Sequence, residues 1–180
     1  NLWIGTFGGG LIRYDKKKNE TLHFFNDPFN QNSLGDNDVL SLCTDRSGII
    51  WAGSHLGAGI TKIYKNNARF NHVKHEPRNQ NTLNDDVVWA IYKDNENILW
   101  VGTYKGGINI YDAASNSFSY INNSDNNKSI SSNHVRAIEE DTYGNLWIGT
   151  YDGGLNIINK KTFKTVVYKN SPGDPLSIGG

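Results

Sequence analysis

The chain has 180 residues, and its 18 Lys and Arg are balanced by 18 Asp and Glu, so its formal net charge is zero at pH 7. This balance excludes the strongly basic surfaces that attract nucleic acid or anionic lipid. No apolar run is long enough to span a bilayer, and the lone Cys43 excludes an internal disulfide framework. The length is that of one domain with a substantial core.

One short sequence occurs four times along the chain. The segment at residues 2–6, Leu-Trp-Ile-Gly-Thr, returns with small changes around Trp51, Trp100 and Trp147, at spacings of 48, 49 and 47 residues. A fixed period of this size indicates an array of one supersecondary unit. Repeat folds place their variable residues on shared faces, and partners bind there.

Each repeat contains short apolar runs separated by turns that are rich in Gly, Asn and Asp, which is typical of β-strands joined by tight turns. In chain order these runs predict an inner strand, a strand that carries the Trp, a third strand and an outer strand. The inner strands are predicted at 39–43, 88–92 and 135–139, and the Trp strands at 2–6, 50–54, 99–103 and 146–150. The third strands are predicted at 11–14, 60–64, 108–111 and 155–158, and the outer strands at 22–25, 70–73, 118–121 and 163–166.

Four antiparallel strands in about 48 residues describe one blade of a β-propeller. A β-sandwich does not need the same Trp at equal intervals, and the coils of a parallel β-helix are much shorter. We therefore predict an all-β propeller fragment with three complete blades and one partial blade that lacks its inner strand. The predicted units are a partial blade at 1–35, blades at 36–84, 85–131 and 132–170, and a linker toward a missing strand at 171–180.

The length of the array favours a piece of a larger propeller over a closed ring of four blades. An open array leaves apolar blade faces uncovered, so we expect the fragment to self-associate.

The Trp and Gly of the repeated sequence are interpreted as structural residues. The Trp offers a large area for burial, and the Gly permits close approach of another backbone. The residues concerned are Trp3, Trp51, Trp100 and Trp147, with Gly5, Gly53, Gly102 and Gly149.

Two features carry a resemblance to a known family. They are the string Gly-Asn-Leu-Trp-Ile-Gly-Thr-Tyr-Asp-Gly-Gly-Leu-Asn at 144–156, and the Asn- and Asp-rich loops that end at 33–34, 82–83, 129–130 and 177–178. Together they resemble the two-component regulator propeller repeat, and the resemblance covers the whole chain. It implies the extracytoplasmic, periplasmic sensor region of a bacterial hybrid two-component histidine kinase, and many such regions detect oligosaccharides. It also implies partners, namely further propeller blades and a downstream immunoglobulin-like domain, and it implies no cofactor and no catalytic residues in the repeat.

Candidate binding residues lie where the repeats differ from one another. Propellers bind ligands mostly on the face that gathers the loops before the inner strands and after the Trp strands. We predict a ligand-binding patch there, made of Trp89, Tyr104, Lys105, His134, Arg136 and Tyr151. Aromatic planes stack on the C–H surface of sugars while polar groups bind the hydroxyls. The alternative is that the Tyr rings pack beneath the loop and that Trp89 packs between blades.

The histidines do not predict a metal site. His72 and His75 are three residues apart on a strand, so their side chains point to opposite faces and cannot hold one metal together. His55 and His134 are the histidines expected to reach the candidate face.

A glycosidase needs two carboxyl groups about 5–10 Å apart across the sugar. The candidate face offers Asp38, Asp86 and Asp152, one in each blade, while Glu139 and Glu140 are interpreted as solvated at a strand end. We therefore predict a sensor segment that is not an enzyme and that responds to an oligosaccharide. The alternatives are a protein-docking or structural propeller module and, third, a carbohydrate-active enzyme.

Overall fold

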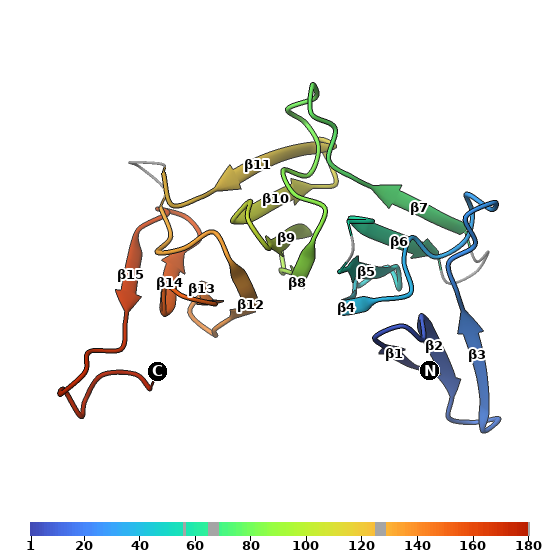
Figure 1. Ribbon diagram of the computed structural model, residues 1–180, viewed down its shortest axis with the longest axis horizontal. Coiled ribbons are helices and arrows are strands. Elements are labelled where there is room, and N and C mark those ends of the chain that lie inside the picture. The colour runs from blue at the N-terminus through green and yellow to red at the C-terminus, as the bar shows by residue number, and fades with distance from the viewer. Residues whose placement is uncertain (56, 65–68, 125–128, 180) are drawn as a thin grey trace.

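The chain forms an open arc of β-sheets. The computed structural model describes residues 1–55, 57–64, 69–124 and 129–179. Fifteen described strands make four antiparallel sheets, which follow one another along the arc (Figure 1). Helices are missing from the described residues, so none of them provides a helix that could cross a membrane. The prediction of a propeller segment with three four-stranded blades and one partial blade is confirmed.

Each sheet is a meander in which strands that are consecutive in the chain are paired. The first sheet contains β1 (Leu2–Gly5), β2 (Leu11–Asp15) and β3 (Glu20–Phe24). The second contains β4 (Val39–Thr44), β5 (Ile50–Ser54), β6 (Ile60–Tyr64) and β7 (Arg69–Val73). The third contains β8 (Val88–Lys93), β9 (Ile98–Thr103), β10 (Ile108–Asp112) and β11 (Ser117–Ile121). The fourth contains β12 (Val135–Glu140), β13 (Asn145–Thr150), β14 (Leu155–Asn159) and β15 (Thr165–Tyr168).

The last outer strand lies two residues beyond its predicted position. Alignment of Phe163 with Phe118 is wrong, because Phe118 pairs with Tyr111 whereas the equivalent pair in the fourth sheet is Ile158 and Thr165. Phe163 instead occupies the left-handed turn position, with φ of 56°, where earlier repeats have Asn. An aromatic residue is uncommon there, but its ring packs against the core between the third and fourth sheets. This contact offsets the backbone strain. The sequence has no Gly or Asn at this position that would have indicated the turn.

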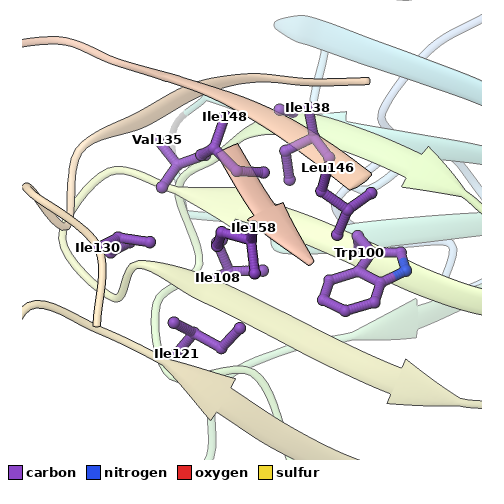
Figure 2. Close-up of a cluster of buried hydrophobic side chains, with 10 residues drawn as sticks. Trp100, Ile108, Ile121, Ile130, Val135, Ile138, Leu146, Ile148 and Ile158 are labelled. Carbon is purple, nitrogen blue, oxygen red and sulfur yellow. The ribbon is translucent and has the colours of Figure 1, made fainter. Parts of the chain in front are cut away.

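Apolar clusters fill the spaces between successive sheets. In the cluster between the third and fourth sheets, Trp100 faces side chains such as Leu146 from the next blade (Figure 2). Trp51 and Trp100 are 2% and 3% exposed, and Trp3 is half-buried. Trp147 is 42% exposed, because no described sheet covers the outer face of the fourth sheet. The Trp is therefore a core residue only where a following blade packs on it.

The Gly of the repeat permits the close approach of the next blade. A methyl group built on Gly53 would lie 2.5 Å from Val88, and one on Gly102 would lie 2.5 Å from Val135. Both Val residues begin the inner strand of the following sheet. Gly5 has the same relation to the second sheet. A methyl on Gly149 would meet only Ala137 of its own sheet, at 3.5 Å.

An Asp in the turn after each inner strand binds the indole of its own sheet. The Nε1–Oδ2 distances are 3.2 Å for Trp51–Asp45, 2.9 Å for Trp100–Asp94 and 3.1 Å for Trp147–Asp141. The backbone N–H of Asn145, together with this indole, lowers the pKa of Asp141 to about 2. The turn carboxylate is therefore held ionised by fixed donors.

Two of these carboxylates also receive a Lys from the following sheet. Lys93 Nζ lies 3.1 Å from Asp45 Oδ2, and Lys160 Nζ lies 3.2 Å from Asp94 Oδ2. Glu140 occupies the position of Lys93 in the fourth sheet. Lys160 Nζ approaches Glu140 Oε1 at 2.6 Å and so neutralises two carboxylates.

The interpretation of Glu140 as a solvated residue is therefore wrong, since only 8% of its side chain is exposed; Glu139 is exposed. The cation between the second and third sheets is Lys93, from the inner strand β8. The cation between the third and fourth sheets is Lys160, from the β14–β15 turn. Alignment of repeats by position does not reveal this exchange, because the two Lys residues are not equivalent.

Candidate ligand-binding site

The inner strand of each complete blade has one residue that takes no part in pairing with the Trp strand. The register shifts between Val39 and Ser41 in β4, and the same shift occurs at the start of β8 and β12. The residues at the bulges are Leu40, Trp89 and Arg136. A β-bulge redirects a side chain and is common beside functional sites. One position of the repeat therefore presents an aliphatic, an aromatic and a cationic side chain in successive blades.

Backbone hydrogen bonds hold the two sets of loops together beyond the bulges. The N–H of Tyr104 donates to the carbonyl of Val87 at 3.0 Å, and the N–H of Tyr151 donates to the carbonyl of His134 at 2.9 Å. In the second sheet the N–H of His55 binds the preceding loop in the same way, at 3.1 Å. The residue after each Trp strand is thereby placed beside the bulge of its own blade.

The rings of the third and fourth blades form a continuous row. The Trp89 and Tyr104 centroids lie 4.8 Å apart, and Tyr104 stacks on His134 at 5.0 Å with 12° between the planes. The guanidinium carbon of Arg136 lies 3.4 Å from the Trp89 centroid and 5.0 Å from that of Tyr151. The row crosses the boundary between two blades, so its geometry depends on how they pack.

A pocket of about 460 Å³ opens beside this row. Five of the six predicted patch residues line it, namely Trp89, Tyr104, His134, Arg136 and Tyr151, together with His55 and Val87. Tyr104 and Tyr151 are 36% and 69% exposed, whereas Trp89 is half-buried against Arg136 of the next blade. A role of these residues in binding stays a prediction.

Lys105 lies outside the pocket lining. Its Nζ lies 5.2 Å from the Tyr104 centroid, at the rim, and its backbone N–H donates to Asp85 at 2.6 Å. His55 reaches the pocket from the second blade. The loop alignment had indicated His55 for this face, and only the packing of the blades brings it to the same cavity.

Two carboxylates lie behind the histidines of the pocket. His134 Nδ1 is 3.5 Å from Asp152 Oδ2, and His55 Nδ1 is 3.8 Å from Asp38 Oδ2. The hydroxyl of Ser132 donates to Asp152 and is the main cause of the lowered pKa of that carboxyl group. Both Nδ1 atoms are buried and make no hydrogen bond to a described residue. The Nε2 atoms are therefore the ring nitrogens left for a ligand.

The pocket is lined mainly by rings and nitrogen-bearing side chains. Stacking surfaces, one guanidinium and imidazole nitrogens line the cavity, and the lining contains no carboxyl group. Within the part of the chain that the structure describes, no three His, Cys, Asp or Glu side chains converge as metal ligands. The arrangement supplies binding contacts to rings and polar groups, without a paired acid and base.

The fold and this site define a class of protein: the sheets are blades of a β-propeller, with a pocket among the loops beside the inner strands. Three segments, at residues 33–55, 82–105 and 129–152, match the family described as the two component regulator propeller. Each matched segment runs from the loop before an inner strand through the Trp strand. These three matches confirm the resemblance to the two-component regulator propeller repeat.

Solved structures share the fold. The extracellular domain of a hybrid two-component system from B. thetaiotaomicron matches 93% of this chain, with a TM-score of 0.80 and 22% identity, and the match covers 23% of that domain. Virginiamycin B lyase from Staphylococcus aureus matches 95% of this chain, with a TM-score of 0.69 and 11% identity, over 52% of the lyase. A streptogramin B lyase matches 89% of this chain, with a TM-score of 0.62 and 14% identity, over 48% of the lyase. No curated protein matches the chain.

Proposed function

We propose that this segment is a non-enzymatic, ligand-binding part of the extracytoplasmic, periplasmic sensor region of a two-component signalling protein. The ligand is an oligosaccharide, bound in the pocket between the third and fourth blades. The observation that carries this proposal is the row of rings and cationic groups around the pocket. Partly exposed aromatic planes beside hydrogen-bonding groups are the combination that binds sugar rings.

The absence of carboxyl groups from the pocket lining supports a binding role over catalysis. A glycosidase places two carboxyl groups on opposite sides of the scissile bond. Here Asp38 and Asp152 lie behind His55 and His134, 3.8 and 3.5 Å from their Nδ1 atoms, and outside the pocket lining. The lyases that share this fold are 11% and 14% identical to this chain, and a shared fold does not establish a shared reaction.

Docking to other parts of the protein is the second candidate function, and the exposed outer faces of the end sheets favour it. Trp147, Val166 and Tyr168 are 42%, 54% and 47% exposed on the fourth sheet. Leu2 and Ile4 are 45% and 40% exposed on the first. Further propeller blades are the partners proposed for these faces, with an immunoglobulin-like domain downstream. In their absence, the same faces would associate between copies of the chain.

Ligand binding is tested with the extracytoplasmic region that contains this chain. A panel of oligosaccharides is screened by thermal shift, and each stabilising sugar is then titrated by calorimetry. Trp89→Ala and Tyr151→Ala should weaken binding. Tyr143→Ala is the matched control, because Tyr143 is an 87% exposed tyrosine in the turn at the other end of the fourth sheet.

Equal stabilisation of the wild type and both pocket variants would refute this binding site. Release of shorter sugars in the same samples would refute the non-enzymatic role.

A further inference from the structure

We propose that the oligosaccharide bound in this pocket is acidic and that Arg136 binds a uronate carboxylate. This inference rests on the proposed function and specifies the chemistry of its ligand. It is carried by the guanidinium group of Arg136, which lines the pocket, lies over the Trp89 ring and has no anionic partner among the described residues.

Arg136 is placed with its donors free. It occupies the β12 bulge, and its guanidinium carbon lies over the Trp89 ring, 3.4 Å from the ring centroid. Stacking uses the face of a guanidinium group and leaves the N–H donors at its edge. No described residue forms an ion pair with Arg136 or accepts a hydrogen bond from its guanidinium. The planar fork is therefore available for bidentate binding of a carboxylate.

The enclosed cations at the other end of the blades, unlike Arg136, form ion pairs. The side chains of Lys93 and Lys160 are 8% and 11% exposed, and each forms an ion pair with a turn Asp. This is the usual arrangement, because an enclosed charge needs a partner. Arg136 is exposed at the pocket, where it contacts rings and no described carboxylate, and Lys105 at the rim has a ring contact but no described ion pair. Arg136 and Lys105 both lie on the side of the blades where the pocket opens.

The carboxylates nearest to the pocket are already engaged elsewhere. Asp152 accepts the Ser132 hydroxyl and lies 3.5 Å from His134 Nδ1. Asp38 accepts the backbone N–H of Gly8 at 2.6 Å and lies 3.8 Å from His55. These contacts direct both carboxylates toward the loops and the histidines, and neither residue lines the cavity. A ligand carboxylate therefore meets Arg136 as the unpaired charge of the pocket, while its sugar rings stack on the exposed Tyr rings.

The test compares acidic oligosaccharides with neutral forms of the same length. Trimers of galacturonate, mannuronate and glucuronate, each beside its methyl ester, are titrated by calorimetry into the extracytoplasmic region that contains this chain. At least one acidic trimer should bind 10-fold or more tightly than its ester, and its affinity should fall as the salt concentration rises.

Arg136→Gln should weaken binding of that trimer by about 10- to 100-fold, the loss expected for hydrogen bonds to a charged group, and should leave the ester within about 3-fold. Arg136→Lys should lose less, because it keeps the charge without the fork. Lys161→Gln is the matched control, since it removes one positive charge from the exposed turn at the other end of β14. Circular dichroism verifies that each variant is folded.

Equal affinity for the acid and its ester would overturn this inference and leave the oligosaccharide site standing. An acidic trimer that binds Arg136→Gln as tightly as it binds the wild type would also overturn it. Binding of neutral sugars alone would do the same. If no sugar of either kind bound, both this inference and the proposed function would fail.

Discussion

Replacement of Trp100 by Ala tests the packing between blades most directly. The side chain is 3% exposed, and burial of a large aromatic residue removes roughly 200 Å² from water. At about 25 cal/mol per Å² this burial is worth about 5 kcal/mol, an upper value because the unfolded chain is already partly compact. We therefore expect a loss of about 3–5 kcal/mol in the free energy of unfolding, in the range measured for buried Trp→Ala changes.

The loss of the indole N–H adds little to this figure. Asp94 keeps its hydrogen bonds from the backbone N–H groups of Glu96 and Ile98 and its contact with Lys160. The carboxylate is therefore not left without partners, and the expected cost comes from the cavity and the lost apolar contacts.

Trp147→Ala in the same 180-residue chain is the matched control. The Trp of the fourth sheet is 42% exposed, so only about three-fifths of its area is buried and its removal leaves no closed cavity. At about 25 cal/mol per Å² the roughly 120 Å² still buried is worth about 3 kcal/mol as an upper value, so a loss of about 2–3 kcal/mol follows. Urea unfolding followed by circular dichroism measures both variants, with slopes compared to ensure that the unfolded state is unchanged. A loss below about 1 kcal/mol for Trp100→Ala, or equal losses for the two variants, would refute the reasoning.

Gly102→Ala should cost about 1–3 kcal/mol, because its methyl would lie 2.5 Å from a valine of the next blade, whereas Gly149→Ala should unfold at nearly the wild-type urea concentration. Equal midpoints for the two would contradict this. Lys160→Met should cost about 3–5 kcal/mol by leaving enclosed carboxylates unpaired, and adding Glu140→Lys should recover part of the loss. A double variant no more stable than the single one would refute the exchange of cations. The pKa of Asp141, lowered to about 2, means that its ionised form stabilises the fold above the ordinary value of 3.8 and that this contribution is lost as the pH falls toward 2. An NMR titration midpoint near 4 would contradict it.

Much of the architecture could be read from local pattern. The Trp spacing predicted the blade, and the Gly and Asn turns predicted most strand limits, because chain reversals require residues that tolerate the left-handed conformation. The last outer strand was predicted at the wrong position because the turn before it does not use such a residue. Phe163 occupies a turn position where Asn19 and Asn116 stand in other repeats, and tertiary packing offsets its backbone strain.

The candidate site was predicted in composition but not in geometry. Differences between aligned repeats indicated Trp89, Arg136 and the two Tyr rings. The bulge that redirects the first two has no signature in the sequence, since the residues around it are an ordinary strand pattern. His55 lines the pocket because the second blade packs beside the third, whereas Lys105 lies at the rim of the pocket.

By itself the sequence determined the repeating unit, the order of its strands and the residues that differ among blades, because turns, strand pattern and a fixed period are local properties of a chain. Only the tertiary structure decided which residues at corresponding positions of the repeats share the same burial and the same charge pairing. Trp100 is buried and Trp147 is exposed, and Arg136 is left unpaired while Lys160 neutralises two carboxylates. These differences arise because each blade is completed by its neighbour, so burial and charge pairing depend on contacts between residues far apart in the chain.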